Sequence, residues 1–382
     1  MAAGHAFMAR ALRLAERGRW TTDPNPRVGC VLVRDGEIVG EGWHQRAGGP
    51  HAERVALAQA GERARGASAF VTLEPCSHHG RTPPCADALI SAGVARVVAA
   101  MIDPNPRVAG RGLERLREAG IAVEVGLLAE QAAALNPGFI KRQRTGLPFC
   151  RVKLAASLDG RTAMASGESR WITSEAARAD VQRLRAGASA ILTGSGTLLA
   201  DDPSLNVRLT AEALGLPPGE AVRQPLRVIV DSRLRTPPTA RLLGLPGATL
   251  IACATDEPAR RAALEAAGAQ VLVCPAPDPS QDPTKDRTET HVDLSTLFGE
   301  LARRELNEIL IEAGPTLAGA ALQAGLVDEL ILYLAPHLMG DAARGLFRLP
   351  GLTQMAERVP LEIHDVRRIG PDLRLTLRPT PR

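Results

Sequence analysis

The sequence predicts two α/β domains. A chain of 382 residues is long enough for two hydrophobic cores, and one core of that size would be unusual. In both halves, short apolar runs that suit buried strands alternate with stretches of helical periodicity, which is the pattern of α/β sheets. A polar stretch at 136–148, punctuated by proline and glycine, is interpreted as the interdomain linker. We therefore predict domains at 1–145 and 146–382.

The first domain is expected to begin with an amphipathic helix over 5–17, which ends at Gly18. Apolar runs on either side of an Asp35-Gly36 turn predict a β-hairpin. Pro50 fits the first turn of the next helix. Strands are then predicted at 69–73, 94–101 and 121–125, with helices from 83 and over 113–118. This order predicts a three-layer domain whose sheet is partly parallel.

The second domain shows the same alternation. Buried strands are predicted at 150–156, 190–193, 226–230, 249–253, 270–273, 307–312 and 329–334, and a half-exposed edge strand at 372–377. A polar, proline-rich stretch at 278–290 is expected to be a surface loop. Glycine-bearing turns at 193–197 and 313–316 lead from strands into helices, where phosphates bind. Neither turn has the G-x-G-x-x-G pattern, so alone they indicate a dinucleotide only weakly.

A histidine and two cysteines predict one zinc ion in the first domain. The chain reads His51-Ala52-Glu53, then Pro75-Cys76 and Pro84-Cys85. Three protein ligands leave the fourth tetrahedral position to water, whose pKa the metal lowers to about 7. Glu53 is then free to carry a proton from that water to a ring nitrogen and on to ammonia. The pattern is typical of zinc-dependent base deaminases.

Eight residues separate the two cysteines, where zinc deaminases usually have two. We interpret this insert as a loop that reads the substrate. The alternative is a closed structural zinc site with His78 or His79 as the fourth ligand. That alternative leaves Glu53 without a role, so the catalytic site is preferred.

Composition limits the remaining classes of function. The net charge of +4 is spread along the chain without a basic block, which suits small anionic ligands better than a nucleic acid. No run approaches 18 apolar residues and no apolar leader is recognised, so neither a membrane span nor a signal peptide is predicted. The other four cysteines lie in or beside apolar runs and are expected to be core thiols in a reducing cytoplasm: Cys30, Cys150, Cys253 and Cys274.

The hexapeptide Asp-Pro-Asn-Pro-Arg-Val occurs twice, at 23–28 and at 103–108. One interpretation is two stiff turns of similar geometry. The other is that both loops line one pocket, with Asn25 as the better ligand because an amide can read a pyrimidine edge through two hydrogen bonds.

These residues resemble one family along the whole chain, the bifunctional riboflavin-biosynthesis proteins, in which a pyrimidine deaminase precedes a reductase. The resembling stretches are Pro24-Asn25-Pro26, Val28-Gly29, His51-Ala52-Glu53, Pro75-Cys76-Ser77-His78, 80–85, 152–160, 171–174, Gly196-Thr197, 200–203, and Glu312 with Gly314. The resemblance implies a cytidine-deaminase-like first domain and a dihydrofolate-reductase-like second domain that uses NADPH. It also implies the chemistry: ammonia leaves a pyrimidine ribosylamine phosphate, and hydride then reaches the ribosyl C1′, in its ring-opened imine form, to give a ribityl chain.

The resemblance also implies roles for individual residues. In the first domain these are the zinc ligands His51, Cys76 and Cys85, the proton carrier Glu53, and the substrate contacts Asn25, His78 and Arg81. In the second domain the catalytic pair is Lys153 and Asp201, and the substrate contacts are Ser169, Arg185, Arg208 and Glu312. Cofactor contacts are implied at Ala155, Trp171, Thr197, Asp201, Ser232 and Gly314. Without the resemblance, Arg185 and Arg208 could equally be solvated helix arginines.

Two details of the cofactor region stay open. Ala313 stands where the family usually has a glycine, which matters only if that backbone requires a positive φ. Arg233 and Arg235 follow Ser232 and are predicted to meet the 2′-phosphate of NADPH; the alternative is that they solvate a loop.

The sequence disfavours two other classes of protein. A nucleic-acid base deaminase with an accessory domain would need a basic stripe and stacking aromatic residues, and only 3% of the residues are aromatic. A zinc-stabilised binding protein without chemistry is disfavoured because Glu53 is intact. We expect a homo-oligomer, with a dimer favoured, that binds neither nucleic acid nor membrane.

Overall fold

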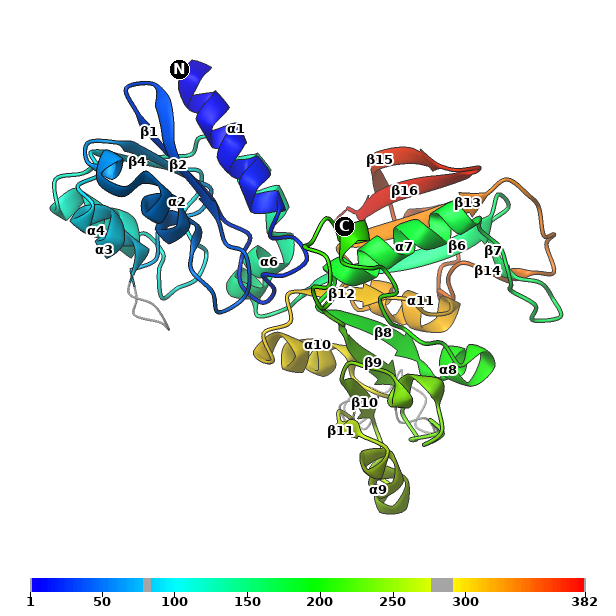
Figure 1. Cartoon of the computed structure of the whole chain (residues 1–382). Helices are drawn as coiled ribbons and strands as arrows, with labels where there is room; N and C mark the ends of the chain where they lie inside the picture. The colour runs from blue at the N-terminus through cyan, green and yellow to red at the C-terminus, as the bar shows by residue number, and fades with distance from the viewer. Residues whose placement is uncertain (1, 78–83, 276–290, 381–382) are drawn as a thin grey trace. The chain divides into compact units, whose positions relative to one another are not determined.

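The computed structural model describes residues 2–77, 84–275 and 291–380 (Figure 1). The chain divides into two compact units, Met1–Leu147 and Pro148–Arg382. The predicted boundary after residue 145 lies close to this division, but the predicted linker is not a linker. Most of it is helix α6 (Pro137–Thr145), with proline at its start and a left-handed Gly146 after its end. Its polar composition reflects a helix that buries little besides Gly138 and Phe139.

The first unit is built on a five-stranded sheet in the order β2-β1-β3-β4-β5. The strands are β1 (Gly29–Arg34), β2 (Glu37–Trp43), β3 (Ser68–Val71), β4 (Arg96–Ala99) and β5 (Ala122–Val125). The predicted hairpin pairs β1 with β2, β1 is also antiparallel to β3, and the last three strands are parallel. The predicted mixed sheet is therefore confirmed.

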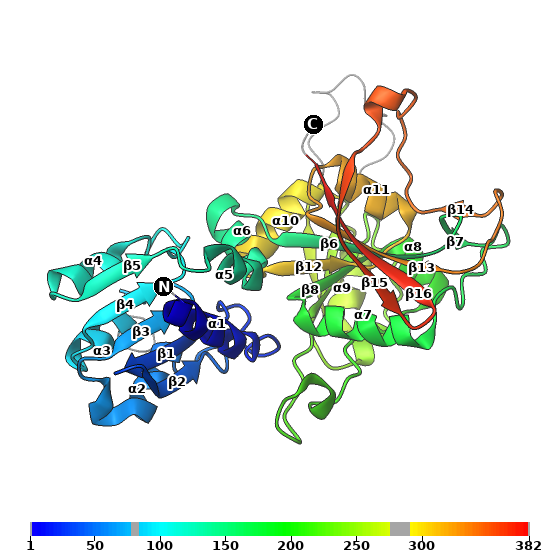
Figure 2. The ribbon, with the colours of Figure 1, turned by 90° about the horizontal axis from the view of Figure 1, so that it is seen from above.

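Helices cover both faces of this sheet (Figures 1 and 2). They are α1 (Ala2–Glu16), α2 (Ala52–Ala60), α3 (Cys85–Ser91), α4 (Arg111–Glu118) and α5 (Ala129–Leu135). Apolar residues of α1 and α5 share one core cluster with the sheet, and those of α2, α3 and α4 share the other. This arrangement confirms the three layers. Helix α5 was not predicted, and Pro50 lies just before α2 because His51 is the N-cap.

The second unit contains a nine-stranded sheet in the order β11-β10-β9-β8-β12-β6-β13-β16-β15. The strands are β6 (Phe149–Ser157), β8 (Ala190–Gly194), β9 (Leu226–Val230), β10 (Thr249–Cys253), β11 (Ala269–Val273), β12 (Glu308–Ile311), β13 (Glu329–Ala335), β15 (Leu361–Ile369) and β16 (Asp372–Pro379). Strands β7 (Arg161–Ala163) and β14 (Arg344–Gly345) form a separate pair. The large sheet is parallel from β11 to β13, and only β16 runs against the other strands: it pairs antiparallel with both β13 and β15.

One strand was placed wrongly. The segment 372–377, predicted as an edge strand, lies inside the sheet as β16, between β13 and β15. The edge is β15, whose residues are mostly exposed. The alternation in β16 reflects one solvated sheet face, because a strand with neighbours on both sides still has two different faces.

The helices of this unit are α7 (Glu175–Gly187), α8 (Ser195–Asp201), α9 (Pro258–Ala266), α10 (Leu294–Arg303) and α11 (Pro315–Gln323). Ala177 and Val181 of α7 share a core cluster with Ile331 and Tyr333 of β13. The predicted surface loop at 278–290 lies outside the described residues. Among the described helices, none combines the length and apolarity that crossing a bilayer requires.

Candidate functional site

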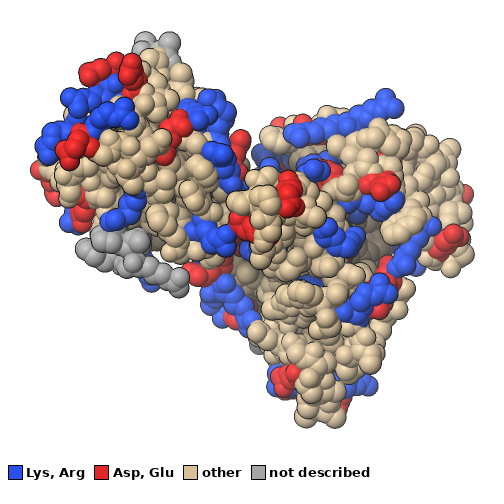
Figure 3. Space-filling view, in the orientation of Figure 1, with Lys and Arg blue, Asp and Glu red and all other residues tan. Residues whose placement is uncertain are grey.

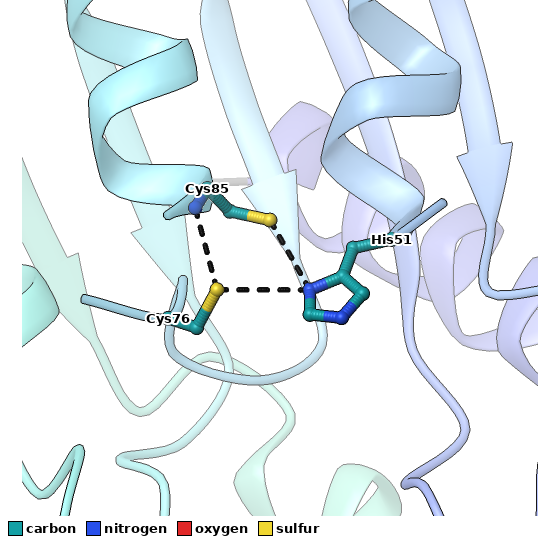
Figure 4. A group of neighbouring side chains, drawn as sticks. All are labelled: His51, Cys76 and Cys85. Atoms are coloured by element: carbon teal, nitrogen blue, oxygen red, sulfur yellow. Dashed lines mark hydrogen bonds between the residues drawn. The ribbon is translucent and has the colours of Figure 1, made fainter. Parts of the chain in front are cut away.

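Three predicted ligands converge in the first unit (Figure 4). His51 caps α2, Cys76 follows β3, and Cys85 is the first residue of α3. One ligand atom from each lies within 4.8 Å of the others. The Nδ1 atom of His51 is 3.6 Å from the sulfur of Cys76 and 3.3 Å from that of Cys85. Two sulfurs and one imidazole nitrogen form a donor set that suits tetrahedral zinc with one position left over.

The protonation of the two thiols is also suited to a cation. Hydrogen bonding from Cys85 lowers the pKa of Cys76 to about 4, and His51 acts in the same direction. The shared hydrogen bond, together with burial, raises the pKa of Cys85. The pair therefore carries one proton: Cys76 is the thiolate and Cys85 is the thiol. A divalent ion would replace that proton and stabilise both sulfurs as thiolates.

Glu53 lies in the first turn of α2 and does not belong to the ligand group. Its side chain is buried, with 3% of the residue exposed. Burial, and then the negative charge of Cys76, raise the pKa of Glu53 to about 6. A carboxyl group in this range can both accept and release a proton near neutral pH.

Asn25 reaches the site through a residue that the sequence analysis missed. Its amide nitrogen lies 3.0 Å from Nε2 of His44, and Nδ1 of His44 lies 3.0 Å from the carbonyl oxygen of Pro50. A carbonyl can only accept, so Nδ1 carries the proton and Nε2 accepts from Asn25. The His44 ring also meets the ring of His51 edge-on, at 5.4 Å between centroids. The only sequence signal was a histidine directly after an alternating strand.

The two copies of the repeated hexapeptide differ in conformation but lie near the same site. The Asp23-Pro24 bond is cis, whereas Asp103-Pro104 is not. The interpretation as turns of similar geometry is wrong, because the first copy turns at 23–24 and the second turns at 106–108. The first copy contributes Asn25, and the second contributes Asp103, whose pKa is raised to about 6 by burial and also by the nearby charges of Glu74 and Cys76. His78, His79 and Arg81 lie outside the described residues.

In the second unit, four predicted polar residues form one cluster. Arg185 donates two hydrogen bonds to Glu312, at 2.6 and 2.8 Å. Burial alone would raise the pKa of Glu312, but Arg185, Lys153 and Arg208 lower it. Burial lowers the pKa of Lys153. Lys153 thus has the carboxylate partner that a cation in an apolar strand requires.

The predicted cofactor residues gather at the carboxyl ends of neighbouring strands. Ser232 follows β9, Thr197 lies in α8 after β8, Gly314 follows β12, and Ala155 lies near the end of β6. A Cβ atom on Gly314 would lie 3.9 Å from the Thr197 hydroxyl. Ala313 has no positive φ, so alanine is conformationally neutral there. Open α/β sheets bind ligands at this edge.

The segment with Ser169 and Trp171 is joined to the last residue of α8. Arg170 donates to the backbone oxygen of Asp201 at 2.9 Å and to its carboxylate at 3.2 Å. Trp171 is 72% exposed, and Arg178 lies over its ring at 4.5 Å. The indole is therefore available to a planar ligand.

Comparison with known proteins identifies both units. Residues 1–101 match the model of the cytidine and deoxycytidylate deaminase zinc-binding region, and residues 148–375 match the RibD C-terminal domain. The chain is 56% identical to the riboflavin biosynthesis protein RibD of Escherichia coli, over 97% of this chain and 98% of that protein. It is 51% identical to RibD of Haemophilus influenzae, over 98% of this chain and 96% of that protein.

Solved structures of related proteins also resemble this chain. RibD of Acinetobacter baumannii superposes with a TM-score of 0.89 at 46% identity, covering 100% of this chain and 99% of that one. A diaminohydroxyphosphoribosylaminopyrimidine deaminase/5-amino-6-(5-phosphoribosylamino)uracil reductase of Thermotoga maritima gives 0.83 at 30% identity, covering 99% of each chain. The predicted fold class, a cytidine-deaminase-like unit followed by a dihydrofolate-reductase-like unit, is confirmed. Because the second unit matches a reductase model, it is not an accessory to a nucleic-acid deaminase.

Proposed function

Because this chain belongs to the RibD family of riboflavin biosynthesis proteins, we propose that its two units act in turn on one phosphorylated aminopyrimidine. As a member of that family the chain is a deaminase and a reductase. The proposed order is deamination of 2,5-diamino-6-(5-phosphoribosylamino)pyrimidin-4-one and then reduction of its ribosyl group, the two activities for which the T. maritima relative is named. The observation that carries the first step is the grouping of His51, Cys76 and Cys85 beside the buried Glu53.

We assign His51, Cys76 and Cys85 to the zinc ion and Glu53 to proton transfer. A zinc ion bound there supplies a Lewis acid that lowers the pKa of a coordinated water. Glu53 would carry the proton that a pyrimidine ring nitrogen receives and would assist the departure of ammonia. Asn25, held by His44, contacts the pyrimidine edge, and the family pattern adds His78 to the ring and Arg81 to the phosphate.

For the reduction, hydride must reach C1′ of the ring-opened imine and a proton must reach the attached nitrogen. Lys153 is proposed to supply the proton, because burial lowers its pKa and eases proton release. Asp201 is assigned to the same catalytic group. Ser169, Arg185, Arg208 and Glu312 are assigned to the substrate, with the arginines facing its phosphate.

A reductase domain indicates a nucleotide cofactor, and we propose NADPH, which supplies the hydride when bound. Its proposed contacts are Ala155, Trp171, Thr197, Asp201, Ser232 and Gly314. Support comes from the position of four of them at the carboxyl ends of β6, β8, β9 and β12.

The assignment of the metal residues is tested by measuring zinc content and ammonia release together. Cys76→Ser and Cys85→Ser should lose both zinc and deamination, because each removes a ligand. Glu53→Gln should keep zinc and lose deamination, because it removes only the proton carrier. Zinc absent from the Glu53→Gln protein would contradict the assignment of Glu53 as a non-ligand.

We also propose that the chain forms a dimer through strand β15. The edge of a sheet offers unpaired backbone groups, and this edge carries exposed apolar side chains. Leu361 is 41% exposed, Ile363 63% and Val366 54%. A second copy that pairs with β15 would cover them. Light scattering should give a dimer for the native chain and a monomer for Ile363→Glu; an unchanged mass would place the interface elsewhere.

We place the protein in the cytoplasm. No disulfide joins any of the six cysteines, and four of them are buried and lie outside the proposed ligand group. Thiols that must stay reduced to bind metal are suited to a reducing compartment.

A further inference from the structure

A surface hollow lies beside the proposed metal centre. Six residues line it: Ser77, Arg107, Arg111, Glu114, Arg115 and Glu118. Ser77 directly follows Cys76, one of the three proposed metal ligands. Arg107 belongs to the second copy of the repeated hexapeptide. Figure 3 shows charged side chains of both signs gathered over the part of the first unit where Figure 1 draws α3 and α4.

Close packing holds the start of α4 against the segment that carries Cys76. The carboxylate of Glu74 accepts hydrogen bonds from the backbone nitrogens of Gly110 at 2.8 Å and Gly112 at 2.9 Å. It also accepts one from the nitrogen of Asp103 at 3.1 Å. A Cβ atom on Gly112 would lie 1.9 Å from the carbonyl oxygen of Pro75, so only glycine permits this approach. The loop that carries Arg107 and the segment that carries Cys76 are therefore held against each other.

Two of the three arginines in the hollow have no partner for their charge among the described residues. Arg115 is bound by Asp87, at 2.5 Å. Arg107 and Arg111 are exposed, and among the described residues neither has an ion pair or a side-chain hydrogen bond. The two carboxylates in the hollow, Glu114 and Glu118, are exposed acceptors. Two unpaired cations next to two acceptors match a ligand that carries both an anion and hydroxyl groups.

We propose that Arg107 and Arg111 bind the phosphate of the deaminase substrate, with Glu114 and Glu118 facing its ribose hydroxyls. This inference rests on the proposed function, since it takes the phosphoribosyl group of that substrate as the ligand. Because the hollow begins one residue away from Cys76, the phosphoribosyl group of a pyrimidine held at the metal centre can extend into it. The two arginines are thus specificity-determining residues for the phosphorylated substrate, acting besides the family-implied Arg81.

The test compares the phosphorylated aminopyrimidine with its dephosphorylated form in the zinc-loaded full chain. The variants are Arg107→Ala, Arg111→Ala and the two combined, and the control is Arg117→Ala, an exposed arginine of the same helix outside the hollow. Loss of one charge-assisted hydrogen bond should raise KM for the phosphorylated substrate about tenfold or more per arginine. KM for the dephosphorylated substrate, kcat and zinc content should stay as in the native chain. Equal changes for both substrates, or none, would overturn the proposal.

A second readout needs no turnover and so separates this proposal from the proposed function. Calorimetric titration with ribose 5-phosphate should show one binding event fewer per chain in the double variant, and the native stoichiometry in Arg117→Ala. Native stoichiometry in the double variant would overturn the proposal. If the native chain releases no ammonia yet the double variant loses the binding event, the proposed deamination fails while the phosphate site stands.

Discussion

At the scale of single residues, one buried carboxyl group connects the metal centre to its chemistry. Glu53 lies two positions from His51 in the first turn of α2, so the same helix start presents a ligand and a proton carrier. The raised pKa of Glu53 follows from burial beside a negatively charged sulfur. A solvated carboxylate would stay ionised at neutral pH and would be a poorer acid.

The first prediction concerns cofactor preference. Arg235 donates to the hydroxyl of Ser195 at 3.0 Å, which brings its charge to the carboxyl ends of β8 and β9. If it meets the 2′-phosphate of NADPH, Arg235→Ala should raise KM for NADPH by about ten- to a hundredfold and leave KM for NADH nearly unchanged. Arg233→Ala, at the other predicted position, is the comparison that distinguishes the two. Equal weakening of both cofactors would mean that the arginine holds the loop.

The metal residues could be predicted from the sequence because each belongs to a short, recognisable motif. His51, Cys76 and Cys85 each stand in a short motif, and the structure brings them together. His44 could not be found this way, since its importance depends on contacts with Asn25 and Pro50 that form only when β2 meets the start of α2. The ion pair between Arg185 and Glu312 could not be predicted either, because the two residues lie 127 positions apart in the sequence.

At the scale of elements, the site depends on how closely α2 lies on the sheet. A Cβ atom on Gly42 of β2 would lie 2.3 Å from the carbonyl oxygen of Ala52 and 2.6 Å from the nitrogen of Ala56. Glycine at this strand position therefore lets the backbone of α2 touch the backbone of β2.

We predict that Gly42→Ala destabilises the first unit by about 1–3 kcal/mol and lowers its zinc content, because α2 carries His51 and must move away. Reduction of the deaminated intermediate by the second unit should be unaffected. Gly4→Ala in α1 is the matched control, since its new Cβ atom would lie 3.6 Å from Phe70, an ordinary contact. Native zinc content and stability in Gly42→Ala would show that the helix is not held by this approach.

A second prediction at this scale is a pH dependence. Arg10 of α1 binds Glu41 of β2 through two bonds of 2.7 Å, which lowers the pKa of Glu41. A carboxyl pKa that folding depresses adds stability above the unfolded value of about 4.3, and this stability is lost as the pH falls through the folded value. Glu41→Gln should therefore lower the free energy of unfolding at pH 7 by about 0.2–1 kcal/mol. Urea titrations should show this difference disappearing in acid; a constant difference would assign it to packing.

Most elements were predictable because apolar periodicity identifies buried faces. Helix α6 and strand β15 were missed because they bury little: α6 reads as a polar linker and β15 is exposed along most of its length. The prediction of 372–377 as the edge strand is wrong because alternating polar and apolar residues show only that one face of a strand is solvated. They do not show how many strands flank it.

At the scale of the whole molecule, two compact units within one chain suggest that the two reactions can be separated. The units divide between Leu147 and Pro148, and the second has its own nine-stranded sheet. We predict that a fragment starting at Leu147 folds and reduces the deaminated intermediate without metal. Circular dichroism and cofactor oxidation would check this. A fragment that stays unfolded would mean that the boundary lies elsewhere or that the units share a core.

The most direct test of the account uses Glu53→Gln in the full chain, followed by ammonia release and by absorbance of the reduced cofactor. With the diaminopyrimidine substrate and NADPH, the native chain should release ammonia and oxidise the cofactor, whereas the variant should do neither. With the deaminated intermediate, both proteins should oxidise NADPH at the same rate, because the second unit is intact. If the variant still releases ammonia at the native rate, Glu53 does not carry the proton and the central assignment is wrong.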